Sequence, residues 1–126
     1  CSIGDALLQV HRCYLAPVQR LWAAGIDVRG LAHITGGGIT DNLPRIFPAG
    51  LAARIHLGRW PVLPIFTLIQ QLGEVPIDEM LHVFNMGLGM LVVVPPDQAA
   101  LVTATLPGDA YVIGEMMAGT VGVEYV

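Results

Sequence analysis

Three consecutive glycines mark the part of the sequence whose residue types are best suited to chemistry, residues 32–45 (AHITGGGITDNLPR). The pattern predicts a strand that ends at Gly36, Gly37 and Gly38 and continues directly into a short helix. In that geometry backbone N–H groups converge where no Cβ blocks an approaching ligand, which favours an anion. Three side chains of the same segment can add hydrogen-bond donors for a phosphate: Thr35, Asn42 and Arg45.

Two interpretations of this glycine turn remain open. A Walker-type phosphate loop is excluded, because no Gly-Lys-Ser/Thr follows the glycines and the chain contains no lysine. A tight strand-to-helix turn with close packing explains the glycines as well as an anion site does. His33 precedes the turn, and its residue type alone indicates a hydrogen-bonded, half-buried histidine more often than a catalytic group.

A second glycine motif occupies residues 84–90 (FNMGLGM), between a predicted helix and the most apolar predicted strand. Gly87 and Gly89 flank a single leucine, which indicates a backbone that bends sharply or is approached closely by another group. A helix C-cap followed by a bulge is the favoured explanation. Asn85 then either caps the helix or donates a hydrogen bond to a ligand.

The composition excludes several classes of function. A formal net charge of −4 at pH 7 argues against nucleic-acid binding, which needs a basic face. Ser2 is the only serine and lacks a Gly-x-Ser-x-Gly context, so a serine hydrolase is excluded. The uncharged stretches 60–73 and 82–96 are shorter than the roughly 20 residues of a membrane-spanning helix, so no membrane association is expected. Cys1 and Cys13 match no zinc or disulfide spacing, so we expect reduced thiols, a cytoplasmic protein and no metal site in this chain.

Helical and strand patterns alternate along the chain, which predicts a single domain over residues 1–126. The fold class is α/β (α+β), a mixed sheet with helices packed on it. Helices are predicted at 17–24, 40–46, 64–72, 77–84 and 97–106, and strands at 28–34, 51–57, 90–94, 110–115 and 121–126. The strand at 51–57 should carry Arg54 and His56 on one face, and a hairpin turn at 118–120 should join the last two strands.

The motifs together resemble a known family. In order, the chain contains HITGGGITDNLPRIFP, IF with IQQLG, DEM and FNMGLGM. This series resembles the C-terminal domain of aminoimidazole ribonucleotide synthetase, also called phosphoribosylformylglycinamidine cyclo-ligase, and the resemblance spans nearly the whole chain. The amidine synthetase of the preceding purine step and the selenophosphate, thiamine-phosphate and hydrogenase-maturation proteins share that family's fold but not this pair of motifs.

The resemblance implies an ATP-dependent ring closure in purine biosynthesis. ATP activates the formyl oxygen of formylglycinamidine ribonucleotide as a phosphoryl ester, and a nitrogen on the amidine side attacks to give aminoimidazole ribonucleotide, ADP and phosphate. The resemblance also implies a homodimer whose ATP and Mg site lies mainly on an N-terminal domain. It assigns His33 to orienting the substrate, and it places along the substrate Thr35, Gly36, Gly37, Gly38, Asn42 and Arg45, with Asn85, Gly87 and Gly89 as a second wall.

The departures from the family are as informative as the match. The family's N-terminal half and the Ser-Gly-His-Asn-Gly stretch that opens its C-terminal domain lie outside this chain, which begins at Cys1 rather than Met. We therefore expect a piece of the enzyme that is inactive by itself and binds neither ATP nor Mg alone, because phosphoryl transfer depends on metal and charge stabilisation. Only 13% of the residues are charged, about half the usual share, so part of the apolar surface should face the missing domain or a second subunit.

Two further functions remain open. One is a stand-alone, non-catalytic module that binds a ribonucleotide or phosphate at the glycine turn, which millimolar or tighter binding by the chain would favour. The other is an assembly domain that pairs through exposed apolar surface, which concentration-dependent dimerisation without ligand binding would favour.

Overall fold

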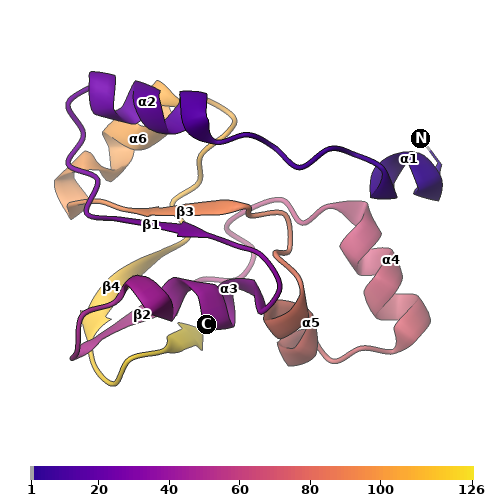
Figure 1. Cartoon of the computed structure of the whole chain (residues 1–126). Helices are drawn as coiled ribbons and strands as arrows, with labels where there is room; N and C mark the ends of the chain where they lie inside the picture. The colour runs from indigo at the N-terminus through magenta and orange to yellow at the C-terminus, as the bar shows by residue number, and fades with distance from the viewer. Residues whose placement is uncertain (1) are drawn as a thin grey trace.

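The computed structural model describes residues 2–126, which contain both helices and strands (Figure 1). The α-helices of this part of the chain are α1 (Ile3–Leu7), α2 (Leu15–Ala23), α3 (Gly38–Asn42), α4 (Pro64–Gly73), α5 (Ile77–Val83) and α6 (Ala99–Thr105). Two short 3-10 helices adjoin them: η1 (Leu43–Ile46) follows α3, and η2 (Pro96–Gln98) precedes α6. The strands are β1 (Gly30–His33), β2 (Leu51–Ile55), β3 (Met90–Val93), β4 (Gly114–Ala118) and β5 (Val123–Tyr125). The α+β class predicted from the sequence is confirmed.

The strands form two separate sheets. β1 and β3 pair antiparallel, with Gly30 opposite Val93 and His33 opposite Met90. β2 is the central strand of a three-stranded mixed sheet, in the order β4-β2-β5, antiparallel to β4 and parallel to β5. Helices α2 and α6 cover one side of the β1–β3 pair, and α3 and the three-stranded sheet lie on its other side (Figure 1).

Two apolar clusters hold these layers together. The larger one joins β1, α3, β2 and α5, and its buried residues are Ala32, Ile34, Ile39, Leu43, Ala53, Ile55, Trp60, Met80, Leu81, Met86 and Leu91. The smaller one joins α2 and α6 through Leu21, Ile26, Val102 and Leu106. The glycine turn therefore leaves β1 at the edge of the larger core, which fixes its position relative to α5.

The local sequence explains most of the element boundaries. Gly25, with a φ of +75°, ends α2, and its N–H donates to the Trp22 carbonyl at 3.0 Å. The predicted two-faced pattern of β2 is confirmed, since Ala53 and Ile55 are buried while the alternate residues face polar partners. Those partners are acidic: Arg54 pairs with Glu124 at 3.0 Å and Glu115 at 3.8 Å, and His56 contacts Glu115 at 3.1 Å.

The predicted hairpin at the C-terminal end is wrong. β4 and β5 do not pair with each other, because β2 lies between them, with Ala53 opposite Met116 on one side and Val123 on the other. The penultimate strand also begins at Gly114, later than the predicted residues 110–115. Gly114 passes so close to β2 that a Cβ there would overlap the Arg54 carbonyl oxygen. This pairing depends on residues about sixty positions apart, which local periodicity does not register.

Helix α1 was not among the predicted elements. Its capping box is complete, since the Asp5 N–H donates to Ser2 Oγ at 3.1 Å and the Ser2 N–H donates to Asp5 Oδ2 at 2.7 Å. An extended arm, residues 8–14, leads from α1 to α2 (Figure 1). Apolar side chains on α1 and this arm are exposed: Ile3 57%, Leu7 64%, Leu8 83% and Val10 93%. Among residues 2–126, no helix has the length and apolar character needed to span a bilayer.

Candidate functional site

The glycine turn connects β1 to α3 and packs tightly against α5. Gly37 is the N-cap of α3 in the left-handed conformation, with a φ of +98°, and Gly38 has a φ of +60°. A Cβ at Gly38 would overlap the carbonyl oxygen of Leu81, so the close packing of the turn against α5 requires glycine there. Close packing, one of the two interpretations of the glycine turn, therefore accounts for Gly38.

The outer part of the turn remains open. A Cβ at Gly36 would meet no atom within 4 Å. Within residues 2–126, the N–H of Gly38 donates to the Thr35 carbonyl at 3.1 Å, whereas the N–H groups of Gly36 and Gly37 have no protein acceptor. Gly36 is exposed, so its free N–H is compatible with the anion interpretation. Gly37 is half-buried, and a Cβ there would lie 2.8 Å from Asp41 Cβ.

The turn is held from beneath by one buried amide. Asn42 is 5% exposed, and its Nδ2 donates to the carbonyl oxygens of Gly38 at 2.8 Å, Gly36 at 3.2 Å and Thr35 at 3.3 Å. The Thr35 hydroxyl donates in return to Asn42 Oδ1 at 3.4 Å. Asn42 was predicted beside the substrate, but the structure turns its side chain inward, so its contribution to any ligand passes through the shape of the turn.

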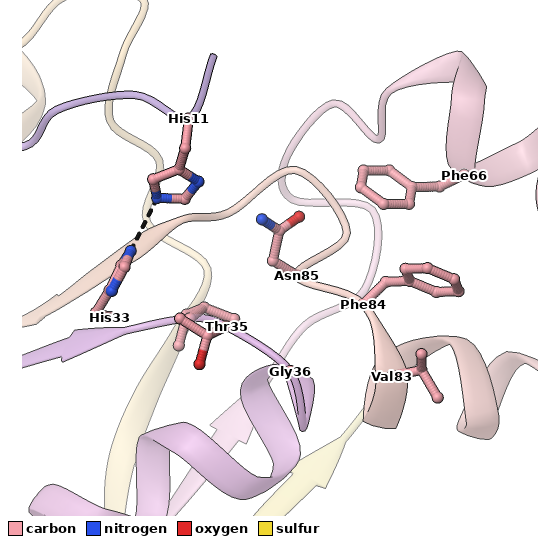
Figure 2. A pocket seen from close by; sticks show the side chains of 9 residues that line it. His11, His33, Thr35, Gly36, Phe66, Val83, Phe84 and Asn85 are labelled. Carbon is pink, nitrogen blue, oxygen red and sulfur yellow. Dashed lines mark hydrogen bonds between the residues drawn. The ribbon is translucent and has the colours of Figure 1, made fainter. Parts of the chain in front are cut away.

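An open pocket of about 420 Å³ lies beside the turn (Figure 2). It is bounded by the arm, the end of β1, α4 and the end of α5, and its lining residues are His11, His33, Ile34, Thr35, Gly36, Phe66, Val83, Phe84 and Asn85. The pocket thus brings together four of the predicted site residues from the two glycine motifs. The two histidines are the titratable side chains among those lining residues, and one wall is aromatic, with Phe66 and Phe84 ring centroids 5.8 Å apart.

His33 contacts a second histidine that the sequence analysis did not select. His11 Nε2 lies 2.8 Å from His33 Nε2, and the two ring centroids are 5.0 Å apart at an interplanar angle of 68°. Tyr14 presents its ring edge-on to both, at centroid distances of 5.9 Å and 6.3 Å. His11 and His33 lie 22 positions apart in the sequence, and the irregular arm that carries His11 has no periodicity that would have indicated the contact between the two rings.

The second glycine motif contributes Asn85 to the pocket and uses its glycines elsewhere. Asn85 Oδ1 accepts the Gly87 N–H at 2.9 Å, and its amide nitrogen lies on the side of the histidine pair (Figure 2). Gly87 has a φ of +94° and supports this tight turn. Gly89 is buried, and a Cβ there would overlap the Tyr14 hydroxyl, so this glycine makes room for the arm.

Arg45, the last residue of the first glycine motif, lies away from the pocket. It lies in η1, beyond the C-terminal end of α3, and is not among the residues that line the pocket. Phe66, Val83 and Phe84 line the pocket without having been predicted, because apolar residues at helical spacing look like ordinary core in the sequence. The available signal was position: Val83 and Phe84 lie at the end of a predicted helix, directly before the second glycine motif.

Residues 2–126 match the family described as AIR synthase related protein, C-terminal domain. The chain belongs to this family. This AIR synthase related domain is 44% identical over 128 residues to the phosphoribosylformylglycinamidine cyclo-ligase of Bifidobacterium longum subsp. infantis, across 99% of the chain and 37% of that relative. It is 48% identical over 116 residues to the enzyme of the same name from Enterococcus faecalis, across 92% of the chain and 33% of that relative. The domain thus spans about a third of the length of the curated relatives it matches.

Solved structures show the same fold in a different protein. The AIR synthase related domain superposes on E. coli HypE, a hydrogenase maturation protein, with a TM-score of 0.69 and 23% identity, covering 97% of this chain and 39% of that one. The HypE–HypF complex gives a TM-score of 0.72 at 21% identity, covering 98% of this chain and 44% of that one. At these identities the likeness establishes the fold, and the cyclo-ligase relatives carry the argument about function.

Proposed function

We propose that this chain is the C-terminal part of a phosphoribosylformylglycinamidine cyclo-ligase, the enzyme that closes the ring of formylglycinamidine ribonucleotide to give aminoimidazole ribonucleotide in purine biosynthesis. The observation that carries the proposal is 44% identity over 99% of the chain to a protein of that name. Fold likeness alone would not distinguish this activity from that of a hydrogenase maturation protein. The pocket adds support, because it joins His33 and Thr35 of the first glycine motif to Asn85 of the second.

The chain's own residues bind and orient the ribonucleotide in this proposal. The free backbone N–H groups of Gly36 and Gly37 are donors for its phosphate, in a turn whose shape Asn42 and the Thr35 hydroxyl maintain. The imidazole of His33 and the amide of Asn85 approach the pocket from two other elements and orient a polar group of the substrate. The Phe66 and Phe84 rings, which contact each other at an interplanar angle of 55°, exclude water from the opposite wall.

ATP and Mg belong to the proposed reaction, but this chain supplies few groups suited to them. When bound, ATP provides the phosphoryl group that turns the formyl oxygen into a leaving group. The six basic residues are all arginines dispersed along the sequence, and residues 2–126 contain no group of three or more metal-ligating side chains placed to hold an ion. We therefore place the ATP and Mg ligands on the remaining two thirds of the parent protein.

The partners in this proposal are the N-terminal domain and a second subunit. The exposed apolar side chains of α1 and the arm, from Ile3 to Val10, are the surface most in need of cover. The chain without its partner is expected to be inactive, because the groups that stabilise phosphoryl transfer lie outside it. A cytoplasmic location forms part of the same proposal.

The decisive experiment is an assay of the full-length protein that carries this domain. With formylglycinamidine ribonucleotide, ATP and Mg, we expect one ADP and one phosphate for each aminoimidazole ribonucleotide formed. The variant His33→Ala should lower kcat/KM by about a hundredfold, because the substrate group that the imidazole orients is then misplaced. The matched control His56→Ala, at the residue that follows β2, should leave kcat/KM within about twofold of wild type.

Two outcomes would contradict the proposal in different ways. Product formation at the wild-type rate by His33→Ala would remove this histidine from the site while keeping the enzyme assignment. Absence of product with the wild-type protein, together with binding of inorganic phosphate by the chain, would favour a non-catalytic ribonucleotide- or phosphate-binding domain.

A further inference from the structure

The arm that carries His11 is fixed by two contacts that follow that residue. Arg12 forms two hydrogen bonds with Asp109, of 3.0 Å and 2.8 Å, which tie the arm to the loop after α6. Tyr14 is seated against Gly89, where any larger residue would collide with its hydroxyl group. His11 comes directly before these two anchors and contacts His33 of β1, so its position is determined by the fold and not by the histidine contact alone.

The contact between the two imidazoles restricts their protons. A hydrogen bond between two ring nitrogens needs one N–H donor and one unprotonated acceptor, so the 2.8 Å separation requires one Nε2 atom to lack a proton. The hydrogen bond made by one nitrogen of a histidine determines which form the other nitrogen takes. His11 therefore acts on the protonation and on the ring orientation of His33 while standing at the edge of the pocket.

The surroundings of the pair contain few other groups that would influence its protons. On the arm, the charged or titratable neighbours are Arg12 and Tyr14, and Arg12 is already paired with Asp109. β3 contributes Met90. From β1, α4 and the end of α5, the side chains that line the adjoining pocket are uncharged: Ile34, Thr35, Phe66, Val83, Phe84 and Asn85.

We propose that His11 is a positioning residue for His33: through the Nε2 to Nε2 hydrogen bond it sets the tautomer and the ring orientation that His33 presents to the pocket. The inference rests on the proposed function only where it concerns the reaction. The state of the imidazole is a property of the chain itself, so it is measurable without turnover.

The first test is the ¹⁵N NMR signature of the His33 ring in this chain, compared between wild type and His11→Leu. We expect the two ring nitrogen shifts of His33 to change in His11→Leu and to return toward wild type in His11→Gln, whose amide can both donate and accept. The control His56→Leu removes a histidine far from the pair and should leave the His33 signals unchanged. Identical His33 shifts in wild type and in a folded His11→Leu would overturn the proposal, as would a failure of His11→Gln to restore them.

The second test is the steady-state kinetics of the full-length protein. His11→Leu should lower kcat by about tenfold or more with KM little changed, as for other partners that orient functional histidines, and His11→Gln should recover most of the lost kcat. A purely structural role would lower Tm in both variants and leave the kcat of the folded protein unchanged, which would overturn the proposal. If the wild-type protein lacks cyclo-ligase activity but the His33 NMR signals respond as expected, the proposed function fails and the positioning role is supported.

Discussion

Asn42 and Gly38 are joined by a hydrogen bond of 2.8 Å from the side-chain amide to the backbone carbonyl oxygen, inside the turn that leads into α3. Asn42 closes the helix that Gly38 begins, so the two residues tie both ends of α3 to one another. The same amide also reaches Thr35 and Gly36. A residue selected for its ability to contact a ligand is therefore the residue that maintains the conformation of the turn.

Replacement of Asn42 should destabilise the protein. Asn42→Ala leaves three carbonyl oxygens without their common donor in a buried position, and we expect a loss of about 2–4 kcal/mol in the free energy of unfolding. Asn42→Asp should cost at least as much, because a carboxylate accepts but does not donate. Urea unfolding would measure both, with the exposed Thr67→Ala as the control. A free energy of unfolding equal to wild type in Asn42→Ala would contradict the role of Asn42 in holding the glycine turn.

The first and last glycines of the turn, Gly36 and Gly38, should respond in opposite ways to alanine. Gly38→Ala places a Cβ on the Leu81 carbonyl in a left-handed backbone, so it should lower the free energy of unfolding by at least about 2 kcal/mol. Gly36→Ala meets open space, so it should leave stability unchanged or raise it by about 0.4–1 kcal/mol. The thermal unfolding temperatures of the two variants would distinguish a glycine required for close packing, Gly38, from a glycine that faces open space, Gly36. Equal losses in both would refute this division.

The Arg12 to Asp109 contact should control the mobility of the arm more than the stability of the fold. Arg12 lowers the pKa of the Asp109 carboxyl through hydrogen bonding and charge attraction. Because the pKa is lower in the folded state, the ion pair stabilises the contact at pH values above the ordinary Asp pKa of about 4. That contribution is lost as pH falls below about 4 and the carboxylate takes up a proton. Arg12→Ala, and acid in the wild type, should lower the NMR order parameters of the backbone in residues 8–14. Arg29→Ala breaks the local pair with Asp27 and should leave the arm's order parameters unchanged.

Tyr125 should limit stability at alkaline pH. Burial raises the pKa of its hydroxyl, Thr40 opposes this by hydrogen bonding at 2.8 Å, and Asp41 adds to the increase. Because the folded-state pKa lies above the unfolded value, its contribution is complete below about pH 10 and disappears as pH rises further. Ultraviolet titration of tyrosinate should show one late-titrating group that Tyr125→Phe removes. If all three tyrosines titrate together in the folded wild type, the burial argument fails.

Several elements follow from short-range sequence signals. The glycine turn lies between a strand and a helix as predicted, because three glycines end one pattern before the next begins. β3 coincides almost entirely with the β-branched run that indicated it, and Pro64 begins α4 as the pattern required. The two faces of β2 follow from the alternation at its C-terminal end, where Arg54 lies between the buried Ala53 and Ile55. These features depend on neighbours within a few residues, which is why they were predictable.

The failures involve contacts between distant parts of the chain. β5 pairs parallel to β2, and no local signal in residues 118–126 distinguishes that partner from β4. The site shows the same limit, since His11 contacts His33 across 22 positions and the arm that carries it is held by Arg12 and Asp109, 97 positions apart. Asn42 has the residue type expected of a ligand contact, and its inward direction is determined by the helix that follows the turn.

Residue types and their order along the chain established the family, the α+β class, the glycine turn beside His33 and the absence of lysine. Packing in three dimensions assigned the tasks among those residues: Gly38 to a close approach, Asn42 to support, and Gly36, Thr35, Asn85 and the His11–His33 pair to the pocket. Local preferences act through covalent neighbours and are visible in one dimension. The direction of a side chain and the partner of an imidazole depend on burial and distance between remote segments, which exist only once the chain has folded.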